Sequence, residues 1–362
     1  MERRAFLTGV AAAPLVAQAA SRHGLAQGAK PTPAKTSDAP VRRPLIRPKR
    51  LVEGDTVGLI SPATPVSDPD LLQKAERTIR HFGWKVKWGR SVGRKAGYFG
   101  STVEDRLADL HAMFEDPEVD AVFAIRGGYG ASHLLDGIDY DLIRRHPKVF
   151  IGYSDITALH LAIHQQTGLV TFHAPVPLSP LTGYSQKSFR QAITEARPLG
   201  RQTNPPESSS LRPLHPTRVV RPGRTTGPLA GGNLTLISTL MGTPYEIETR
   251  DTILFLEDVG EEPYRIDRML TQLRLAGKLE QAAGIIFGEC VDCGPSEFRP
   301  FVSAGFSLGE VIDAILGPLR IPVLFGLTIG HTADQMTLPL GLRATLDTET
   351  ASIEILESAV RA

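Results

Sequence analysis

The first part of the chain alternates between β-strand and α-helix patterns. Residues 56–60 are a short apolar run, and apolar positions then recur at helical spacing over residues 68–82. The alternation continues to about residue 176. It predicts strands at 85–88, 120–125, 149–151 and 169–172, and helices at 103–114, 142–145 and 156–163. Such alternation favours a parallel sheet with helices on both faces.

A second α/β pattern follows a segment that is rich in proline, serine, arginine and threonine. We expect this segment, residues 178–226, to be a linker between two domains. Beyond it the pattern predicts helices at 233–241 and 263–276, strands at 252–256, 284–287 and 322–327, and a β-rich tail to residue 356. The expected domains are therefore residues 49–177 and a smaller carboxy-terminal α/β domain, residues 227–362.

The composition is that of an ordinary globular protein. The chain has 362 residues, 41% of them hydrophobic, and a formal charge of +1, so it is long enough for two domains and gives no reason to expect nucleic-acid binding. Its only cysteines, Cys290 and Cys293, have Cys-x-x-Cys spacing. Two such ligands do not make a zinc site; a small disulfide and a pair of inert thiols both remain open.

The amino terminus carries an export pattern. Arg3 and Arg4 precede a mildly apolar run, residues 5–20, in the order Arg-Arg-x-Phe-Leu that is typical of twin-arginine signals. The run is too short and too interrupted for a stable membrane span. We expect a signal peptide over residues 1–28, a flexible tether rich in proline and basic residues over 29–48, and a periplasmic location.

Polar residues follow four of the apolar runs, which matters because ligands of open parallel sheets bind outside the carboxyl ends of the strands. These positions are the segment Arg126-Gly127-Gly128-Tyr129-Gly130, then Ser154, Glu257 and His331. A serine needs a base to act as a nucleophile, and a histidine base needs a carboxylate to hold its tautomer. The combination predicts a serine hydrolase site.

Each residue of this predicted hydrolase site also has a competing interpretation. Ser154 and Asp155 are also residue types that cap helices, and the turn departs from the G-x-S-x-G pattern of nucleophilic serines. His173 also follows an apolar run, but we favour His331 because Gly330 beside it leaves the approach open. For the carboxylate, the competitors of Glu257 are Asp258, Glu261 and Glu262.

The glycine-rich segment 126–130 also allows two interpretations. Glycine turns after strands often bind phosphate, but this one lacks both GxGxxG and the lysine of a P-loop. Its glycines would equally let backbone amides approach a carbonyl oxygen. Arg126 would then meet a substrate carboxylate, or else a structural acid.

These motifs resemble those of the LD-carboxypeptidases, the serine peptidase family that includes the microcin C resistance peptidases. The resemblance covers roughly residues 50 to 357. It rests on segment 126–130, on Gly152-Tyr153-Ser154-Asp155, on residues 254–258 with Glu261 and 264–268, and on Gly330-His331.

The resemblance implies a fold, a site and an activity. The fold is a flavodoxin-like amino-terminal domain with a smaller α/β domain, and the active site lies between them, usually in a homodimer. Ser154 would be the nucleophile, His331 the general base and acid, and Glu257 its orienting carboxylate. Amides of Asp155, Gly127 and Gly128 would form the oxyanion hole, without a metal or other cofactor. The best-known activity of the family releases the terminal D-alanine from a murein tetrapeptide.

Two features depart from the family pattern. His173-Ala174-Pro175 stands where the family usually has His-Gly-Pro, and the export signal would place this chain at the wall rather than in the cytoplasm. We expect a periplasmic serine carboxypeptidase acting on L,D-bonds of murein peptides. The alternatives are a microcin-resistance-type peptidase acting on peptide-nucleotide conjugates and a non-catalytic periplasmic binding protein.

Overall fold

The computed structural model describes residues 43–206, 211, 213–295 and 305–362, and residues Val41–Ala362 form one compact unit. The expected signal peptide and most of the expected tether lie outside these residues. Residues 43–48 of that tether are not a free linker, because the amide of Ile46 donates to Gly168 and its carbonyl accepts from Val170, at 2.8 and 2.9 Å. No helix in the described ranges has the length and apolarity to span a membrane.

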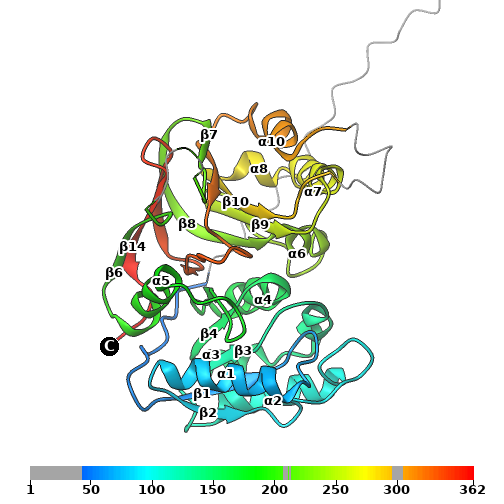
Figure 1. The fold of residues 1–362 in the computed structure, drawn as a ribbon, viewed down its shortest axis with the longest axis vertical. Helices are drawn as coiled ribbons and strands as arrows, with labels where there is room; N and C mark the ends of the chain where they lie inside the picture. The colour runs from blue at the N-terminus through cyan, green and yellow to red at the C-terminus, as the bar shows by residue number, and fades with distance from the viewer. Residues whose placement is uncertain (1–42, 207–210, 212, 296–304) are drawn as a thin grey trace, which may run out of the picture. The chain divides into compact units, whose positions relative to one another are not determined.

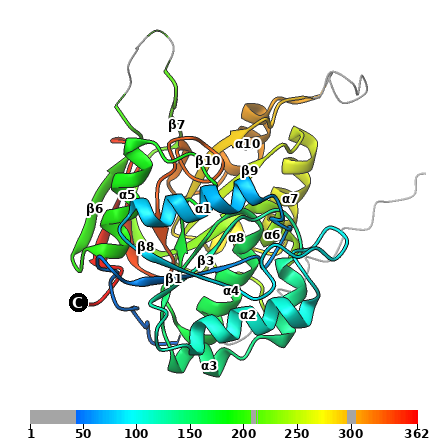
Figure 2. The ribbon, with the colours of Figure 1, turned by 60° about the horizontal axis from the view of Figure 1, so that its bottom comes forward.

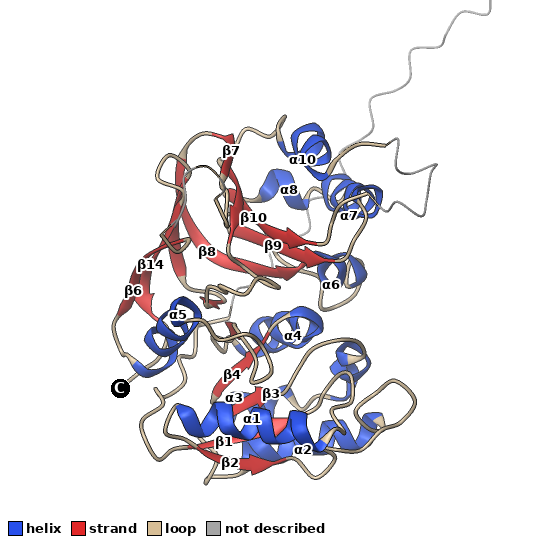
Figure 3. Ribbon diagram, viewed as in Figure 1, coloured by secondary structure: helices blue, strands red, loops and turns tan. Residues whose placement is uncertain are grey.

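The first sheet has six strands in the order β12-β5-β4-β3-β1-β2 (Figures 1 and 3). Strands β1 to β5 are parallel, and their order 2-1-3-4-5 is that of flavodoxin-like folds. The edge strand β12 is antiparallel and comes from far along the chain. The bounds are β1 Thr56–Ile60, β2 Lys85–Trp88, β3 Ala121–Ala124, β4 Val149–Gly152, β5 Phe172–His173 and β12 Leu338–Pro339.

Helices cover both faces of this sheet (Figure 2). On one face Phe123 of β3 packs against Phe189 of α5 and Trp84, and on the other Phe150 of β4 packs against Phe114 of α2. The helices are α1 Pro69–His81, α2 Val103–Glu115, α3 Tyr140–Arg145, α4 Thr157–Thr167 and α5 Gly183–Thr194, with short 3₁₀ helices η1 Ala131–Gly137 and η2 Ser154–Ile156.

Side-chain caps explain where the longer helices begin. Asp68 accepts from the amide of Asp70 at the start of α1, and Thr102 accepts from the amide of Asp105 at the start of α2. Each cap satisfies a backbone donor that has no partner within the helix. Strands β1 to β4 and helices α1 and α2 lie within a few residues of their expected positions.

The second sheet has eight strands in the order β6-β14-β13-β8-β9-β10-β11-β7, with β8 to β11 parallel (Figure 3). It was expected in the smaller domain but has more strands than the first sheet. Its strands are β6 Pro198–Thr203, β7 Arg218–Arg221, β8 Arg224–Asn233, β9 Ile253–Val259, β10 Gly284–Val291, β11 Val323–Leu327, β13 Arg343–Asp347 and β14 Ser352–Ser358. Its helices are α6 Leu234–Thr239, α7 Pro263–Leu275, α8 Lys278–Gln281 and α10 Leu308–Leu316.

Three expectations differ from the structure. The segment 178–226 is not simply a linker: it contains α5, β6 and β7, and β6 pairs with the late strand β14. Strand β5 is confined to Phe172–His173 rather than 169–172, so His173 lies within the strand. Strand β9 continues to Val259, so Glu257 lies inside a strand rather than after it.

The two sheets meet at the start of α4. The amide of Asn233, at the end of β8, donates to the hydroxyl of Thr157 at 3.0 Å. A methyl group on Gly232 would come 2.5 Å from the Thr157 side chain, so the two elements are in close contact. Since Thr157 lies three residues after Ser154, this junction places the second sheet beside the candidate nucleophile.

Candidate active site

Ser154 occupies a strained corner between β4 and α4. Its φ of 64° lies in the left-handed region, which residues other than glycine rarely adopt. The turn is tight: a methyl group on Gly152 would come 2.4 Å from the side chain of Ile156. Neither Ser154 nor Asp155 caps the helix that follows, since η2 and α4 have no side-chain cap. Strain of this kind projects a serine hydroxyl away from the sheet.

The segment 126–130, called the glycine turn from here on, lies against this corner. A methyl group on Gly127 would lie 2.9 Å from Cβ of Ser154 and 3.2 Å from the amide nitrogen of Asp155. Gly128 has a φ of 108°, and the neighbouring amide of Tyr129 donates to the hydroxyl of Thr64 at 2.9 Å. The structure therefore brings together three of the residues expected to form an oxyanion hole. The turn can lie this close to Ser154 only because Gly127 has no side chain.

His331 and Glu257 form a hydrogen-bonded pair. Nδ1 of His331 donates to Oε2 of Glu257 over 2.8 Å, and Glu257 is fully buried in β9. Because a carboxylate only accepts, the proton is on Nδ1 and Nε2 keeps its lone pair. The His331 ring lies 4.9 Å, between centroids, from the ring of Tyr153, which precedes Ser154. Among the described residues, the Ser154 hydroxyl has no hydrogen bond. Without substrate, the hydrogen bond between a nucleophile and its base is often long, and it shortens when substrate binds.

Gly330 makes the His331–Glu257 contact possible. It has a φ of 89°, and a methyl group on it would lie 2.0 Å from Oε2 of Glu257. The sequence suggested that Gly330 leaves space beside the histidine. The structure identifies the occupant of that space as the Glu257 side chain.

Burial and the mutual contact of His331 and Glu257 shift the pKa values of these two residues in opposite directions. Burial by itself would lower the pKa of His331, but the hydrogen bond and charge of Glu257 outweigh it, so the pKa of His331 is raised above its ordinary 6.5. Burial raises the pKa of Glu257 more than the hydrogen bond from His331 lowers it. A raised imidazole pKa suits a group that must accept a proton and later return it.

The competing residues are placed differently. His173 is buried under Tyr153 and Phe255, and burial holds its pKa well below the ordinary value. Neither of its ring nitrogens has a hydrogen-bond partner in the described part of the chain.

The competing carboxylates have structural partners instead of His331. Asp258 accepts from the side chain of Asn233 and from the amide and hydroxyl of Thr235. Glu261 forms an ion pair with Arg265. The Asp258 contacts fix the start of α6 to β9, and the Glu261 ion pair is local to the start of α7.

Asp155 and Arg126 depart from simple expectations. The Asp155 side chain, expected to be a helix cap, is 2% exposed and accepts from the amide of Ala131 at 2.7 Å. Arg126 is exposed at the edge of the glycine turn and has no hydrogen bond or ion pair among the described residues. It is therefore available to a ligand.

Sequence reasoning missed Arg106, which is 1% exposed and donates to the carbonyl of Gly130 at 2.9 Å. A signal was present: Arg106 is in phase with Leu110 and Met113 on the apolar stripe of its helix. A cation on such a stripe indicates a buried, paired role.

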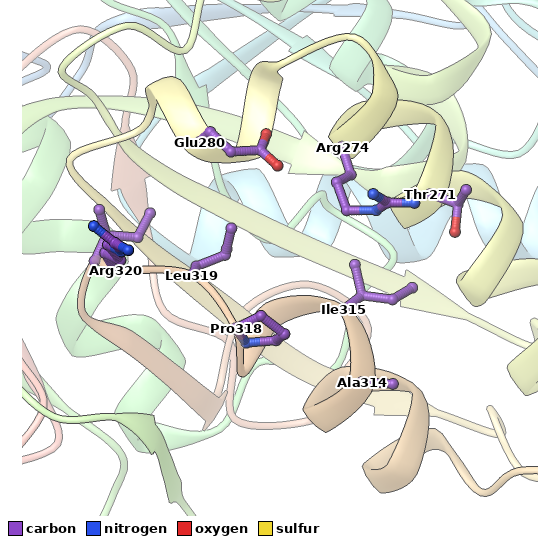
Figure 4. A pocket seen from close by; sticks show the side chains of 9 residues that line it. Thr271, Arg274, Glu280, Ala314, Ile315, Pro318, Leu319 and Arg320 are labelled. Carbon is purple, nitrogen blue, oxygen red and sulfur yellow. The ribbon is translucent and has the colours of Figure 1, made fainter. Parts of the chain in front are cut away.

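A pocket of about 610 Å³ lies elsewhere, between α7, α8 and α10 (Figure 4). Its walls are Thr271, Arg274, Glu280, Ala314, Ile315, Pro318, Leu319, Arg320 and Ile321, and none of these is a candidate site residue. In the described ranges, no group of three or more histidine, cysteine or acidic side chains is placed to hold a metal ion. Cys290 and Cys293 are joined by a disulfide.

Comparison with known families gives two matches that together span most of the described chain. Residues 57–174 match the LD-carboxypeptidase N-terminal domain, and residues 226–346 match the LD-carboxypeptidase C-terminal domain. Among curated proteins, a probable murein peptide carboxypeptidase of Bacillus subtilis (strain 168) is 45% identical over 254 residues. That alignment covers 69% of this chain and 76% of the relative.

Two solved structures are similar over most of their length. The complex of MccF with glutamyl sulfamoyl guanosine superposes with a TM-score of 0.76 at 28% identity, covering 87% of this chain and 99% of that one. A muramoyltetrapeptide carboxypeptidase from Oxalobacter formigenes has a TM-score of 0.70 at 29% identity, covering 83% and 97%.

Proposed function

Because the chain belongs to the LD-carboxypeptidase family, we propose that it is a serine carboxypeptidase that hydrolyses L,D-peptide bonds and releases the terminal D-alanine of murein tetrapeptides. The observation that carries the proposal is the hydrogen bond from His331 to the buried Glu257, with the histidine ring against the residue that precedes Ser154. The name of the Bacillus subtilis relative supports the substrate.

In the proposed acylation, the Ser154 hydroxyl attacks the carbonyl carbon of the bond between the diamino acid and D-alanine. Nε2 of His331 takes the hydroxyl proton, and Glu257 stabilises the imidazolium and holds the ring. The carbonyl oxygen becomes an oxyanion, to which the amides of Asp155 and the glycine turn donate. The C–N bond then breaks, and the amine of D-alanine leaves with the proton from His331.

In the proposed deacylation, water attacks the ester carbonyl while His331 takes one of its protons. The second tetrahedral intermediate collapses, Ser154 regains its proton from the imidazolium, and the shortened peptide leaves as a carboxylate. Arg126, exposed and without a protein partner among the described residues, would meet a carboxylate of the peptide. Its position as the first residue of the glycine turn supports this role in substrate binding.

The test is mass spectrometry of a murein tetrapeptide incubated with the protein and with the Ser154→Ala variant. We expect the wild type to remove one alanine, and the variant to lose turnover by up to about a million-fold. Cleavage by both proteins would rule out Ser154 as the nucleophile. Cleavage by neither would reject the murein tetrapeptide as substrate.

A second candidate substrate has one specific observation in its favour. The solved relative MccF is similar over 87% of this chain and was captured with glutamyl sulfamoyl guanosine. A peptide-nucleotide conjugate should therefore be assayed in parallel. Preferential cleavage of the conjugate would replace the murein assignment while leaving the same chemistry in place. The relatives' names give no support to a non-catalytic binding protein.

We also propose a periplasmic location and a homodimer. The location is supported by the Arg-Arg-x-Phe-Leu pattern at residues 3–7, and the dimer by family resemblance alone. Sedimentation of the purified protein tests the dimer: a species of about twice the mass of the purified chain is expected, and a species of one chain mass would reject it.

A further inference from the structure

The glycine turn is held at its carboxyl end, at Gly130, by two buried charged side chains that belong to other elements. Arg106 comes from α2 and is 1% exposed, and Asp155 follows the candidate nucleophile and is 2% exposed. Charged residues are almost never this buried unless they form hydrogen bonds and have an opposite charge nearby. Their partners therefore indicate what the two charges do.

Arg106 connects the turn to the loop after β1. Its Nη1 donates to the carbonyl of Pro62 at 2.6 Å and to the carbonyl of Gly130 at 2.9 Å. Its Nε donates to the carbonyl of Thr102 at 3.3 Å, and the guanidinium lies 4.8 Å above the centre of the Phe99 ring. One planar cation thus joins α2, the loop after β1 and the end of the glycine turn.

Asp155 holds the same end of the turn through the opposite backbone groups. Its Oδ2 accepts from the amide of Ala131 at 2.7 Å, and this amide belongs to the same peptide group as the carbonyl of Gly130. The peptide group between Gly130 and Ala131 therefore donates its N–H to Asp155 and accepts from Arg106 at its carbonyl. The carboxylate and the guanidinium also attract each other electrostatically, on either side of this peptide group.

The held segment leads directly into the contact with Ser154. Gly127, three residues before Gly130, packs against Cβ of Ser154, and there is no room for even a methyl group between them. A shift of the turn would therefore change where its amides point relative to the serine. Donors of an oxyanion hole act only when they are fixed before the charge develops.

We propose that Arg106 and the side chain of Asp155 are positioning residues that fix the glycine turn for transition-state stabilisation. The inference rests on the proposed function, because it assigns these side chains a part in the same reaction. The sequence predicts a role in the reaction for the amide of Asp155 but not for its side chain. It predicts no role for Arg106.

The proposal makes a kinetic prediction that a simple stabilising role does not make. The oxyanion forms only after substrate binds, so loosening the turn lowers kcat by a larger factor than it raises KM, which also depends on Arg126 of the same turn. Loss of one oxyanion donor costs about 10²–10³-fold in kcat, and we expect losses of this order. Affinity for a peptide boronic acid, which forms a tetrahedral adduct with the serine, should fall by a similar factor.

The variants are Arg106→Met, Arg106→Lys and Asp155→Asn. Arg106→Lys keeps the charge but loses the planar fork, so it should retain the fold and still lose kcat. The matched control is Asp109→Asn. Asp109 is on the same helix, is 4% exposed, and accepts from the amides of Arg90 and Ser91 at 2.7 and 2.9 Å, away from the turn.

The measurements are kcat and KM on the murein tetrapeptide, boronate affinity, and thermal unfolding to show that each variant is folded. A selective fall in kcat and boronate affinity in a folded Arg106 or Asp155 variant, absent from Asp109→Asn, supports the proposal. Unchanged kcat in folded Arg106→Lys and Asp155→Asn, or a loss equal to that of the control, overturns it. Failure of the wild type to cleave the peptide would instead count against the proposed function.

Discussion

At the scale of single residues, the site depends on one missing methyl group. Gly330 passes so close to Glu257 that any β-carbon would lie 2.0 Å from the carboxylate oxygen that His331 binds. The same residue has a φ of 89°, a backbone angle that residues with a β-carbon rarely adopt. Packing and backbone conformation therefore both require glycine at this position.

We predict that Gly330→Ala breaks the His331–Glu257 hydrogen bond and lowers kcat by about 10³–10⁴-fold, the effect of losing the orienting carboxylate elsewhere. Steady-state kinetics measure the loss. The control is Gly54→Ala, whose φ of 88° is almost the same but whose β-carbon would meet nothing within 4 Å. Equal kinetic effects in both variants would mean that backbone strain, and not the carboxylate contact, matters.

The pH dependence of activity is a second prediction at this scale. His331 must be neutral to accept a proton, and Glu257 raises its pKa above 6.5, so the acid limb of kcat/KM should lie above pH 6.5. In Glu257→Gln the charge is lost while burial remains, so the pKa of His331 falls and the limb moves to lower pH. A pH–rate profile of both proteins checks the direction; a limb that does not move would exclude His331 as the titrating base.

At the scale of elements, the junction of β8 with α4 sets the distance between the two halves of the site. Ser154 follows β4 of the first sheet, whereas Glu257 lies in β9 and His331 follows β11 of the second sheet. Besides the contact between the Tyr153 and His331 rings, the two halves are linked by the hydrogen bond from the Asn233 amide to the hydroxyl of Thr157, a residue that is fully buried.

We predict that Thr157→Val, which keeps the shape but removes the acceptor, destabilises the fold by about 1–3 kcal/mol because a buried amide loses its partner. Displacement of the nucleophile should also lower kcat, by up to about 10²-fold. Urea unfolding and kinetics measure both. Thr226→Val, which removes a 2.8 Å hydrogen bond to Thr345 within the second sheet, should leave kcat unchanged. Wild-type kcat in Thr157→Val would show that this junction does not position the serine.

At the scale of the whole molecule, the disulfide and the amino-terminal pattern point to the same compartment. Cys290 and Cys293 are bonded, and disulfides persist in oxidising compartments such as the periplasm. The paired Arg3 and Arg4 are typical of a signal for export in the folded state.

We predict that replacing Arg3 and Arg4 with lysine retains the protein in the cytoplasm, and that the retained protein carries free thiols. Cell fractionation followed by alkylation and intact-mass measurement reports location and oxidation together. The wild type should be periplasmic and resistant to alkylation. Periplasmic protein from the lysine variant would contradict the twin-arginine assignment.

Local patterns in the sequence were sufficient to predict the central elements and the candidate residues. The strand-to-helix corner at Ser154, the glycine turn after β3 and the histidine after Gly330 are all signalled by neighbours in the chain, because side-chain periodicity and turn residues act over short distances. The flavodoxin-like strand order was expected from motif resemblance and is confirmed by the structure.

Only the tertiary structure decided which groups meet. Glu257 and Asp258 are adjacent in β9, and neighbouring side chains of a strand point to opposite faces, so no local pattern could show that Glu257 reaches His331. The burial of Arg106 and the pairing of β6 with β14 also depend on residues far apart in sequence. Local periodicity predicts elements, but contacts between residues 24 positions apart, as for Arg106 and Gly130, or 74 apart, as for Glu257 and His331, are decided by packing, which local patterns do not encode.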